Sequence, residues 1–216
     1  MGAIRKIYKK FRWSLRDKYI GKKQRQRLQN SNFSVIASDC TAGMLYHDLK
    51  CEFNTPTINF FFSAPDFIKF CNNIQHYIDI PMVAIPPDEE AAREGYPLAK
   101  IDDIVLHLVH YSSVEQAQEC WDRRKTRINF NNLFIVMNDR NGCTKQDLLD
   151  FDQLPYKNKV VFTHVPHPEI KSSYYIHGFE NQETVGTMTK FVNPIAIKRN
   201  MDQFDFVTWI NGMKSQ

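Results

Sequence analysis

The stretch 104–144 constrains the fold most strongly, because two apolar runs in it flank one amphipathic segment. The runs 104–109 and 133–137 predict two strands. Between them, an S-x-x-E capping pattern that begins at Ser112 precedes apolar residues at helical spacing, which predicts a helix. Polar residues follow the end of each strand. A strand, a helix and a strand in this order are typical of α/β proteins, whose ligands bind outside the carboxyl ends of the strands.

Similar patterns recur along the rest of the chain. Further strands are expected at 34–38, 57–62, 81–85, 159–163 and 173–176, and a closing helix is expected at 200–213. Helix starts of the S/T-x-x-[DE] kind follow three of the strands. The pattern predicts a Rossmann-like, layered α/β/α fold with a mostly parallel or mixed sheet. Residues 31–216 are expected to form this single α/β domain, with room for a small C-terminal subdomain.

Composition and missing motifs exclude several classes of protein. The chain is 43% hydrophobic, which is enough to bury a core, and no run of about 18 apolar residues predicts a membrane-spanning helix. Five cysteines without a C-x-x-C pair disfavour a disulfide framework and a zinc site. The Gly-rich dinucleotide, P-loop and serine-hydrolase motifs do not occur. We therefore name no cofactor and no metal site, and expect a reduced, cytoplasmic protein.

The first 30 residues form a basic segment. Residues 1–27 hold eleven Lys or Arg and one acid, so that the rest of the chain carries a net charge of −6. Ile4, Tyr8 and Phe11 recur at helical spacing between these cations, which is typical of a basic helix on an anionic membrane surface. Packing of the apolar stripe on the domain itself is the alternative. Nucleic acid is not expected as a partner, because the remainder is acidic and shows no binding motif.

One constellation of residues is suited to nucleophilic catalysis. Cys40 lies in the turn that follows the expected strand 34–38, where backbone N–H groups at a helix start can lower a thiol pKa. His110 and Asp139 follow two other strands, so that the first is a candidate base and the second a candidate partner for its imidazole. Each has a plainer interpretation: a buried packing residue for Cys40, a helix cap for His110 and a turn residue for Asp139.

Several polar residues near these positions are candidates for substrate binding. Three arginines of the expected helix are suited to a phosphate or carboxylate group, although such arginines are more often a solvated face. They are Arg123, Arg124 and Arg127. The remaining candidates follow the strand ends and are Asp39, Tyr111, Asn138 and Arg140.

Four segments together resemble a known family. They read FSVIASDCTAG, TPTINFFFSAPDFIKF, LHLVHYSSVEQAQECWDRRKTRINFNNLFIVMNDRNGCT and LPYKNKVVFTH. In content and order they are similar to the bacterial family labelled exopolysaccharide biosynthesis protein (domain of unknown function nineteen-nineteen), over residues 33–179. The turn 39–43 departs from the family's Asn-Cys-Trp-Gly-Gly-like pattern, since Asp39 and Thr41 replace the Asn and the Trp.

The resemblance implies an α/β fold and a place in exopolysaccharide or capsule assembly. We expect an enzyme that modifies a glycan or a lipid-linked glycan precursor, by acyl transfer or hydrolysis through Cys40. One alternative is a non-catalytic partner of glycan-assembly enzymes, held on the inner face of the cell membrane by residues 1–30. Another is a nucleotide-sugar-dependent transferase that uses the acidic residues 88–90 and a divalent metal. The sequence does not predict the oligomeric state.

Overall fold

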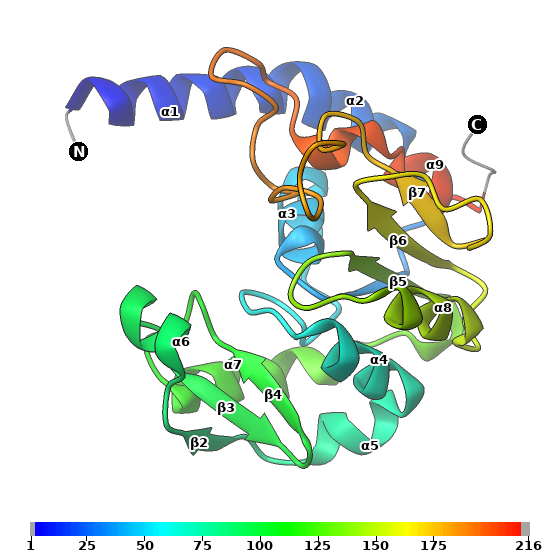
Figure 1. The fold of residues 1–216 in the computed structure, drawn as a ribbon. Coiled ribbons are helices and arrows are strands. Elements are labelled where there is room, and N and C mark those ends of the chain that lie inside the picture. Colours follow the sequence, from blue (N-terminus) through cyan, green and yellow to red (C-terminus); the bar gives the residue numbers. More distant parts are fainter. Residues whose placement is uncertain (1–2, 213–216) are drawn as a thin grey trace.

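A computed structural model describes residues 3–212, with side chains described from residue 6 onward. Its main sheet is parallel, with the strand order β1, β5, β6, β7. The strands are β1 (Ser34–Ala37), β5 (Leu133–Asn138), β6 (Lys159–Thr163) and β7 (Ser173–Tyr175). Because all four run in one direction, their carboxyl ends meet at a single edge of the sheet (Figure 1).

A second, antiparallel sheet lies apart from the main one in Figure 1. Its strands are β2 (Val83–Ile85), β3 (Leu98–Ile101) and β4 (Ile104–His107), and the helix α6 (Glu89–Glu94) connects the first two. The apolar run at the start of the stretch 104–144 is thus a strand, but it belongs to this second sheet. The next strand along the chain, β5, belongs to the main sheet.

Helices cover both faces of the main sheet, which confirms the predicted layered α/β class. Those of the face that includes α3 are α3 (Thr41–Leu49) and α9 (Phe206–Ile210), and those of the other are α4 (Ala64–Asn72) and α8 (Lys145–Gln153). Side chains alternate along β5, so that Phe134 packs with the α3 side and Ile135 with the α4 side. β5 is buried along its whole length, as expected for a parallel strand between two helical layers.

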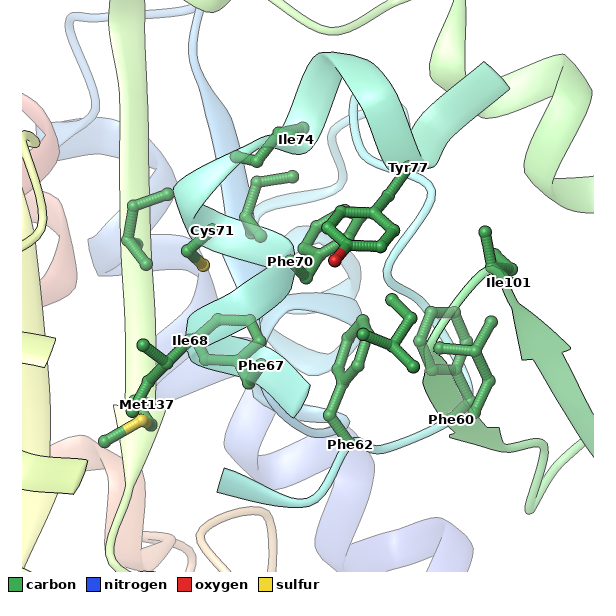
Figure 2. Close-up of a cluster of buried hydrophobic side chains, with 14 of the residues drawn as sticks. Phe60, Phe62, Phe67, Ile68, Phe70, Cys71, Ile74, Tyr77, Ile101 and Met137 are labelled. Atoms are coloured by element: carbon green, nitrogen blue, oxygen red, sulfur yellow. The ribbon is translucent and has the colours of Figure 1, made fainter. Parts of the chain in front are cut away.

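The core around α4 joins the two sheets. Met137 of β5 and Ile101 of β3 both belong to it, and α4 lies between them in Figure 2. Phe67 and Phe70 of α4 are fully buried there beside Phe62. The helices α5 (Ile74–Asp79) and α7 (Val114–Lys125) contribute side chains to the same core. Because both sheets share one core, their relative position is fixed by apolar packing.

The basic N-terminal segment packs on the body instead of extending as a tail. It consists of α1 (Ala3–Arg16), the π-helical turn η1 (Asp17–Gly21) and α2 (Lys22–Arg27). The N-terminal end of α1 reaches beyond the rest of the molecule in Figure 1. None of the helices described between residues 3 and 212 is long and apolar enough to cross a lipid bilayer.

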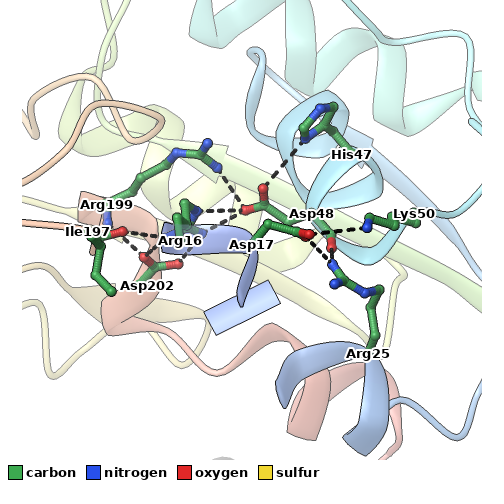
Figure 3. A network of polar contacts seen from close by, with 9 residues as sticks. All are labelled: Arg16, Asp17, Arg25, His47, Asp48, Lys50, Ile197, Arg199 and Asp202. Atoms are coloured by element: carbon green, nitrogen blue, oxygen red, sulfur yellow. Dashed lines mark hydrogen bonds and ion pairs between the residues drawn. The ribbon is translucent and has the colours of Figure 1, made fainter. Parts of the chain in front are cut away.

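A buried ion network holds α1 in place (Figure 3). The Arg16 side chain is 2% exposed and contacts Asp48 of α3 at 2.6 Å, together with Asp202. Arg199, which is 1% exposed, pairs with Asp48 from the other side at 2.7 Å. Burial alone lowers the pKa of Arg16, but its bonds to Asp202 and Asp48 outweigh burial and raise it. Burial lowers the pKa of Arg199, but an arginine keeps its proton at physiological pH, so both arginines are charged and balance the two carboxylates.

Local signals predicted most element boundaries well. Ser63 caps α4 by accepting a hydrogen bond from the Asp66 N–H at 3.2 Å, and Thr144 and Asp147 form a reciprocal capping box on α8. The cap of α7 is Ser113 and not Ser112, since the Ser113 hydroxyl accepts from the Gln116 N–H.

Two predicted elements differ in the structure. The strand expected at 57–62 is wrong: the segment makes only the isolated bridge between Phe61 and His107, because Asn59 takes a positive φ of 69° that interrupts the extended backbone. The closing helix expected at 200–213 is divided into the short 3-10 turn η3 (Asn200–Gln203) and α9. Its last expected residue, Met213, lies outside the described residues.

Candidate functional site

The carboxyl edge of the main sheet brings three chain segments together. The Ser38 N–H donates to Val136 O at 3.0 Å, and the Asp139 N–H donates to Phe162 O at 3.0 Å. The residues that follow β1, β5 and β6 therefore lie side by side in the order of the strands. This is the edge at which open parallel sheets bind their ligands.

Asp39 links the first two of these segments. One of its carboxylate oxygens accepts from Asn138 Nδ2 at 3.0 Å and the other accepts from the Thr41 N–H at 2.9 Å. Asp39 and Asn138 are 7% and 3% exposed, so both bonds are shielded from water. The carboxylate of Asp39 thereby joins the start of α3 to the end of β5, and its two oxygens are already engaged.

Asp139 links the second segment to the third. Its Oδ2 accepts from His164 Nδ1 at 2.5 Å and from the His164 N–H at 2.7 Å, while Oδ1 accepts from the Val185 N–H at 2.7 Å. Asp139 is 5% exposed, whereas the His164 side chain is 21% exposed. A buried carboxylate thus holds an imidazole that still reaches the surface.

This pairing assigns the roles of the two imidazole nitrogens. Because Nδ1 of His164 faces the Asp139 carboxylate, the proton of the neutral ring belongs on Nδ1. Nε2 then carries the free lone pair and is able to accept a proton from a substrate. The carboxylate also stabilises the imidazolium that forms, which is the part played by the aspartate of a nucleophile–base–acid triad. The geometry is that of a general base and its orienting partner.

Cys40 lies at the same edge, as the N-cap of α3. Burial, followed by the negative charge of Asp39, raises the pKa of its thiol to about 12, although the positive charge of Arg140 opposes both. The lowering expected from the helix start is therefore outweighed. The Cys40 side chain is a neutral thiol at physiological pH and has no ready thiolate.

Arg140 is the cation of this edge. Its N–H donates to Asn138 Oδ1 at 3.2 Å, and its guanidinium is close enough to Cys40 to act on the thiol pKa. The side chain is half-buried, and among residues 3–212 it has no carboxylate partner. An arginine without a carboxylate partner in this part of the chain is suited to hold an anionic group of a substrate.

Comparisons with known proteins show the family of the chain that carries this sheet edge. The family model described as "Domain of unknown function (DUF1919)" matches residues 12–211, which include both sheets and the residues of the sheet edge described above. The chain belongs to this family. A relative from Haemophilus influenzae, printed as "Uncharacterized protein", is 40% identical over 193 residues, which are 89% of this chain and 91% of the relative. The domain-of-unknown-function family expected from the sequence motifs is confirmed, and its exopolysaccharide label stays a prediction.

Two predicted site residues of this DUF1919 protein lie elsewhere, because β4 is part of the small sheet. The exposed His110 donates its N–H to Asn59 O at 3.2 Å, and Asp139 pairs with His164 instead of His110. Tyr111 is buried and donates its hydroxyl to Ile58 O at 2.9 Å. The predicted pairing of Asp139 with His110 is thereby corrected. The strand that precedes His110 does not end at the edge of the main sheet.

The three arginines in and directly after α7 make contacts with other parts of the chain. Arg124 is buried and donates to the Tyr111 hydroxyl at 2.7 Å, and Arg127, which follows the helix, donates to Phe53 O at 2.8 Å. Arg123 is exposed, and its guanidinium contacts Cys120 Sγ at 3.5 Å. Arg124 and Arg127 also share a neighbour, because the guanidinium of Arg124 lies 5.2 Å from the centre of the Phe53 ring. The contacts of all three arginines are with groups of this chain, and their binding of a substrate anion stays a prediction.

The sequence analysis assigned no catalytic role to His164, although this residue is part of the site. The sequence offered one signal for it: the residue follows the strand 159–163 directly, as Asp139 follows β5. Its neighbour His167 contacts Glu169 at 3.4 Å. Among residues 3–212, no three His, Cys, Asp or Glu side chains converge into a group that could hold a metal ion.

Proposed function

We propose that this DUF1919 protein is an enzyme that modifies a bacterial glycan or a glycan precursor, with His164 as its general base. The observation that carries the proposal is the pair of Asp139 and His164 at the carboxyl edge of the main sheet. The substrate class follows from the exopolysaccharide label of the proteins that the sequence motifs resemble. The reaction is acyl transfer to a hydroxyl or hydrolysis of an ester, as expected from the sequence.

The base acts directly on the attacking hydroxyl. A glycan hydroxyl or a water attacks the acyl carbon, a C–O bond forms, and the O–H proton passes to Nε2 of His164. When the tetrahedral intermediate breaks down, the bond to the leaving group breaks and the imidazolium returns that proton to it. Asp139 stays ionised throughout and stabilises the cationic ring. No thiolate is required, which agrees with the raised pKa of Cys40.

Arg140 supplies the binding contact in this mechanism. It lies on the same turn as Asp139, and its guanidinium is half-buried and without a carboxylate partner in the described part of the chain. Glycan precursors and acyl donors carry phosphate or carboxylate groups, which match the planar fork of an arginine. We assign Arg140 to such a group, so that the reacting carbon is held near His164.

The test compares two single variants of the full chain. Wild type, His164→Gln and His110→Gln are incubated with capsular oligosaccharides, with and without O-acetyl groups, in the presence and absence of an acyl-thioester donor. Mass spectrometry reads acyl groups gained or lost. His164→Gln should lower turnover by about 10²- to 10⁴-fold, because positioned proton transfer is lost. His110→Gln, the matched histidine of the other sheet, should leave turnover unchanged.

Four results would count against the proposal. Turnover that survives in His164→Gln would show that His164 is not the general base. Turnover that depends on Cys40 and His110 would favour attack by the Cys40 thiol. No acyl transfer or release on the whole panel favours the non-catalytic partner. A dependence on divalent metal together with nucleotide-sugars favours the transferase alternative.

A further inference from the structure

The cations of the N-terminal helices divide into two sets by type. The arginines whose side chains are described point to the body: Arg12 donates to Ala196 O at 2.6 Å, Arg16 enters the buried network, and Arg27 pairs with Asp205. The lysines do not. Among residues 3–212, none of them has a carboxylate within ion-pair distance; they are Lys6, Lys9, Lys10, Lys18, Lys22 and Lys23.

The contacts of the arginines fix how α1 is turned. Tyr8, Arg12 and Arg16 follow one another at four-residue spacing, and all three bond the chain between 193 and 202. The guanidinium of Arg12 also lies 3.7 Å from the centre of the Phe191 ring. One stripe of α1 is therefore held against the C-terminal part of the chain, and the remaining stripes have a fixed orientation.

A different stripe of α1 is apolar and faces solvent. Ile7 is 67% exposed and Phe11 is 59% exposed, and their four-residue spacing places them next to each other on the helix surface. Val192 and Ile195, in the segment that binds Tyr8 and Arg12, are also exposed, Ile195 to 85%. Large apolar side chains that are this exposed in one region indicate an interaction surface.

Lysines border this stripe. Lys10 is three residues from Ile7 and Lys6 precedes Ile7 directly, so both flank the stripe, whereas Lys9 is two residues from Ile7 and from Phe11 and lies on the opposite side of the helix. The stems of these three lysines and the Trp13 ring line a shallow hollow of about 360 Å³. Long lysine stems over apolar surface, with their ammonium groups at the rim, are typical of side chains that reach toward lipid headgroups.

We propose that the outer face of α1, formed by Lys6, Ile7, Lys10 and Phe11, binds the surface of an anionic phospholipid membrane. Ile7 and Phe11 enter the boundary between headgroups and acyl chains, and the lysines meet lipid phosphates. The buried ion network keeps the helix on the body, so the whole molecule is brought to the membrane. This inference does not depend on the proposed reaction.

Vesicle binding tests the proposal. The full chain is sedimented with vesicles of phosphatidylcholine alone and with vesicles that also contain phosphatidylglycerol. We expect binding to the anionic vesicles, weak binding to the neutral ones, and release by salt. The variant Lys6→Gln/Lys10→Gln should lower the partition coefficient by about thirtyfold, at about 1 kcal/mol for each cation. Ile7→Ser/Phe11→Ser should also lose most of the binding.

A matched variant controls for the loss of exposed apolar surface. Val83→Ser/Phe130→Ser removes two exposed apolar side chains, 63% and 40% exposed, from β2 and the 3-10 turn η2 (Phe130–Asn132). It should bind anionic vesicles as wild type does. Thermal unfolding of all variants should be close to that of wild type, since none of the changed side chains is buried.

Other outcomes would overturn the proposal. These are no binding to anionic vesicles, equal binding to both vesicle types, or an equal loss in the control variant. If the chain instead forms dimers in sedimentation velocity that Ile7→Ser/Phe11→Ser dissociates, and does not bind vesicles, then the face is an interface between copies of this chain.

Discussion

Two buried carboxylates in this molecule have opposite kinds of partner. Asp48, beneath α1, is 8% exposed and lies between the guanidinium groups of Arg16 and Arg199. Asp139, at the carboxyl edge of the main sheet, is 5% exposed and accepts from two backbone N–H groups and the His164 ring. An arginine keeps its proton at any physiological pH, whereas a histidine exchanges its proton in that range.

The difference separates a site that stabilises the fold from the site that we propose for catalysis. At Asp48 the buried partners are the permanent charges of Arg16 and Arg199, while the exposed His47 lies 3.6 Å away. The two arginines and Asp48 belong to α1, α3 and the segment before η3, which the network fastens together. At Asp139 the partner ring is partly exposed at a sheet edge, and one of its nitrogens is free. Burial of a carboxylate alone therefore does not indicate function. What distinguishes the two sites is the partner of the carboxylate, and whether that partner can give up a proton.

The largest effect should come from Asp48→Asn. The change leaves Arg199, which is 1% exposed, without a carboxylate partner, and Arg16 keeps only Asp202. Removing one member of a buried ion network costs about 3–5 kcal/mol of unfolding free energy. Urea denaturation measures the loss.

Asp17→Asn is the matched control for this change. Asp17 pairs with Arg25 and Lys50, but its side chain is 46% exposed. An exposed pair contributes about 0–1 kcal/mol, so the control should unfold nearly as wild type does. Equal losses in the two variants would contradict the structural role given to Asp48.

A smaller loss of stability is expected for Asp139→Asn. The asparagine keeps one acceptor oxygen and turns an amide NH₂ toward N–H donors, so at least one buried donor is left unpaired. Such a group costs about 1–3 kcal/mol. His164→Gln should cost less, because the backbone N–H groups of His164 and Val185 still bond the carboxylate. Urea denaturation of both variants checks this order, and the reverse order would show that the ring, and not the backbone, holds Asp139.

The comparison also shows what the sequence was able to predict. Signals within a few residues were sufficient for the caps at Ser63 and Thr144 and for the strand 159–163. Asp39, Asn138 and Asp139 were correctly expected at strand ends that meet, because parallel strands share one edge.

Partners far apart in the chain were not predictable from one sequence. Arg16 and Asp202 are 186 residues apart, and Arg199 and Asp48 are 151 residues apart. The residue paired with Asp139 depends on which strand lies next to β5. The sequence order suggested the strand before His110, but the core around α4 places that strand in the second sheet and β6 beside β5. Tertiary packing, and not local pattern, selected His164.

The smallest effect on stability and turnover is expected for a change at Cys40. The reactivity of its thiol tests whether His164, and not a Cys40 thiolate, begins the reaction. With a pKa of about 12, only about one thiol in ten thousand is ionised at pH 8, against about a quarter for an ordinary thiol. Because the pKa is raised, alkylation of the folded protein should be slow at pH 8 and rise about tenfold per pH unit. In urea the rate should approach that of a free thiol. Mass spectrometry after iodoacetamide treatment reads each cysteine, and Cys40→Ala should retain turnover. Rapid alkylation of folded Cys40 at pH 8 that His110→Ala abolishes would return the nucleophile to Cys40 and leave Asp139 and His164 as a second structural pair.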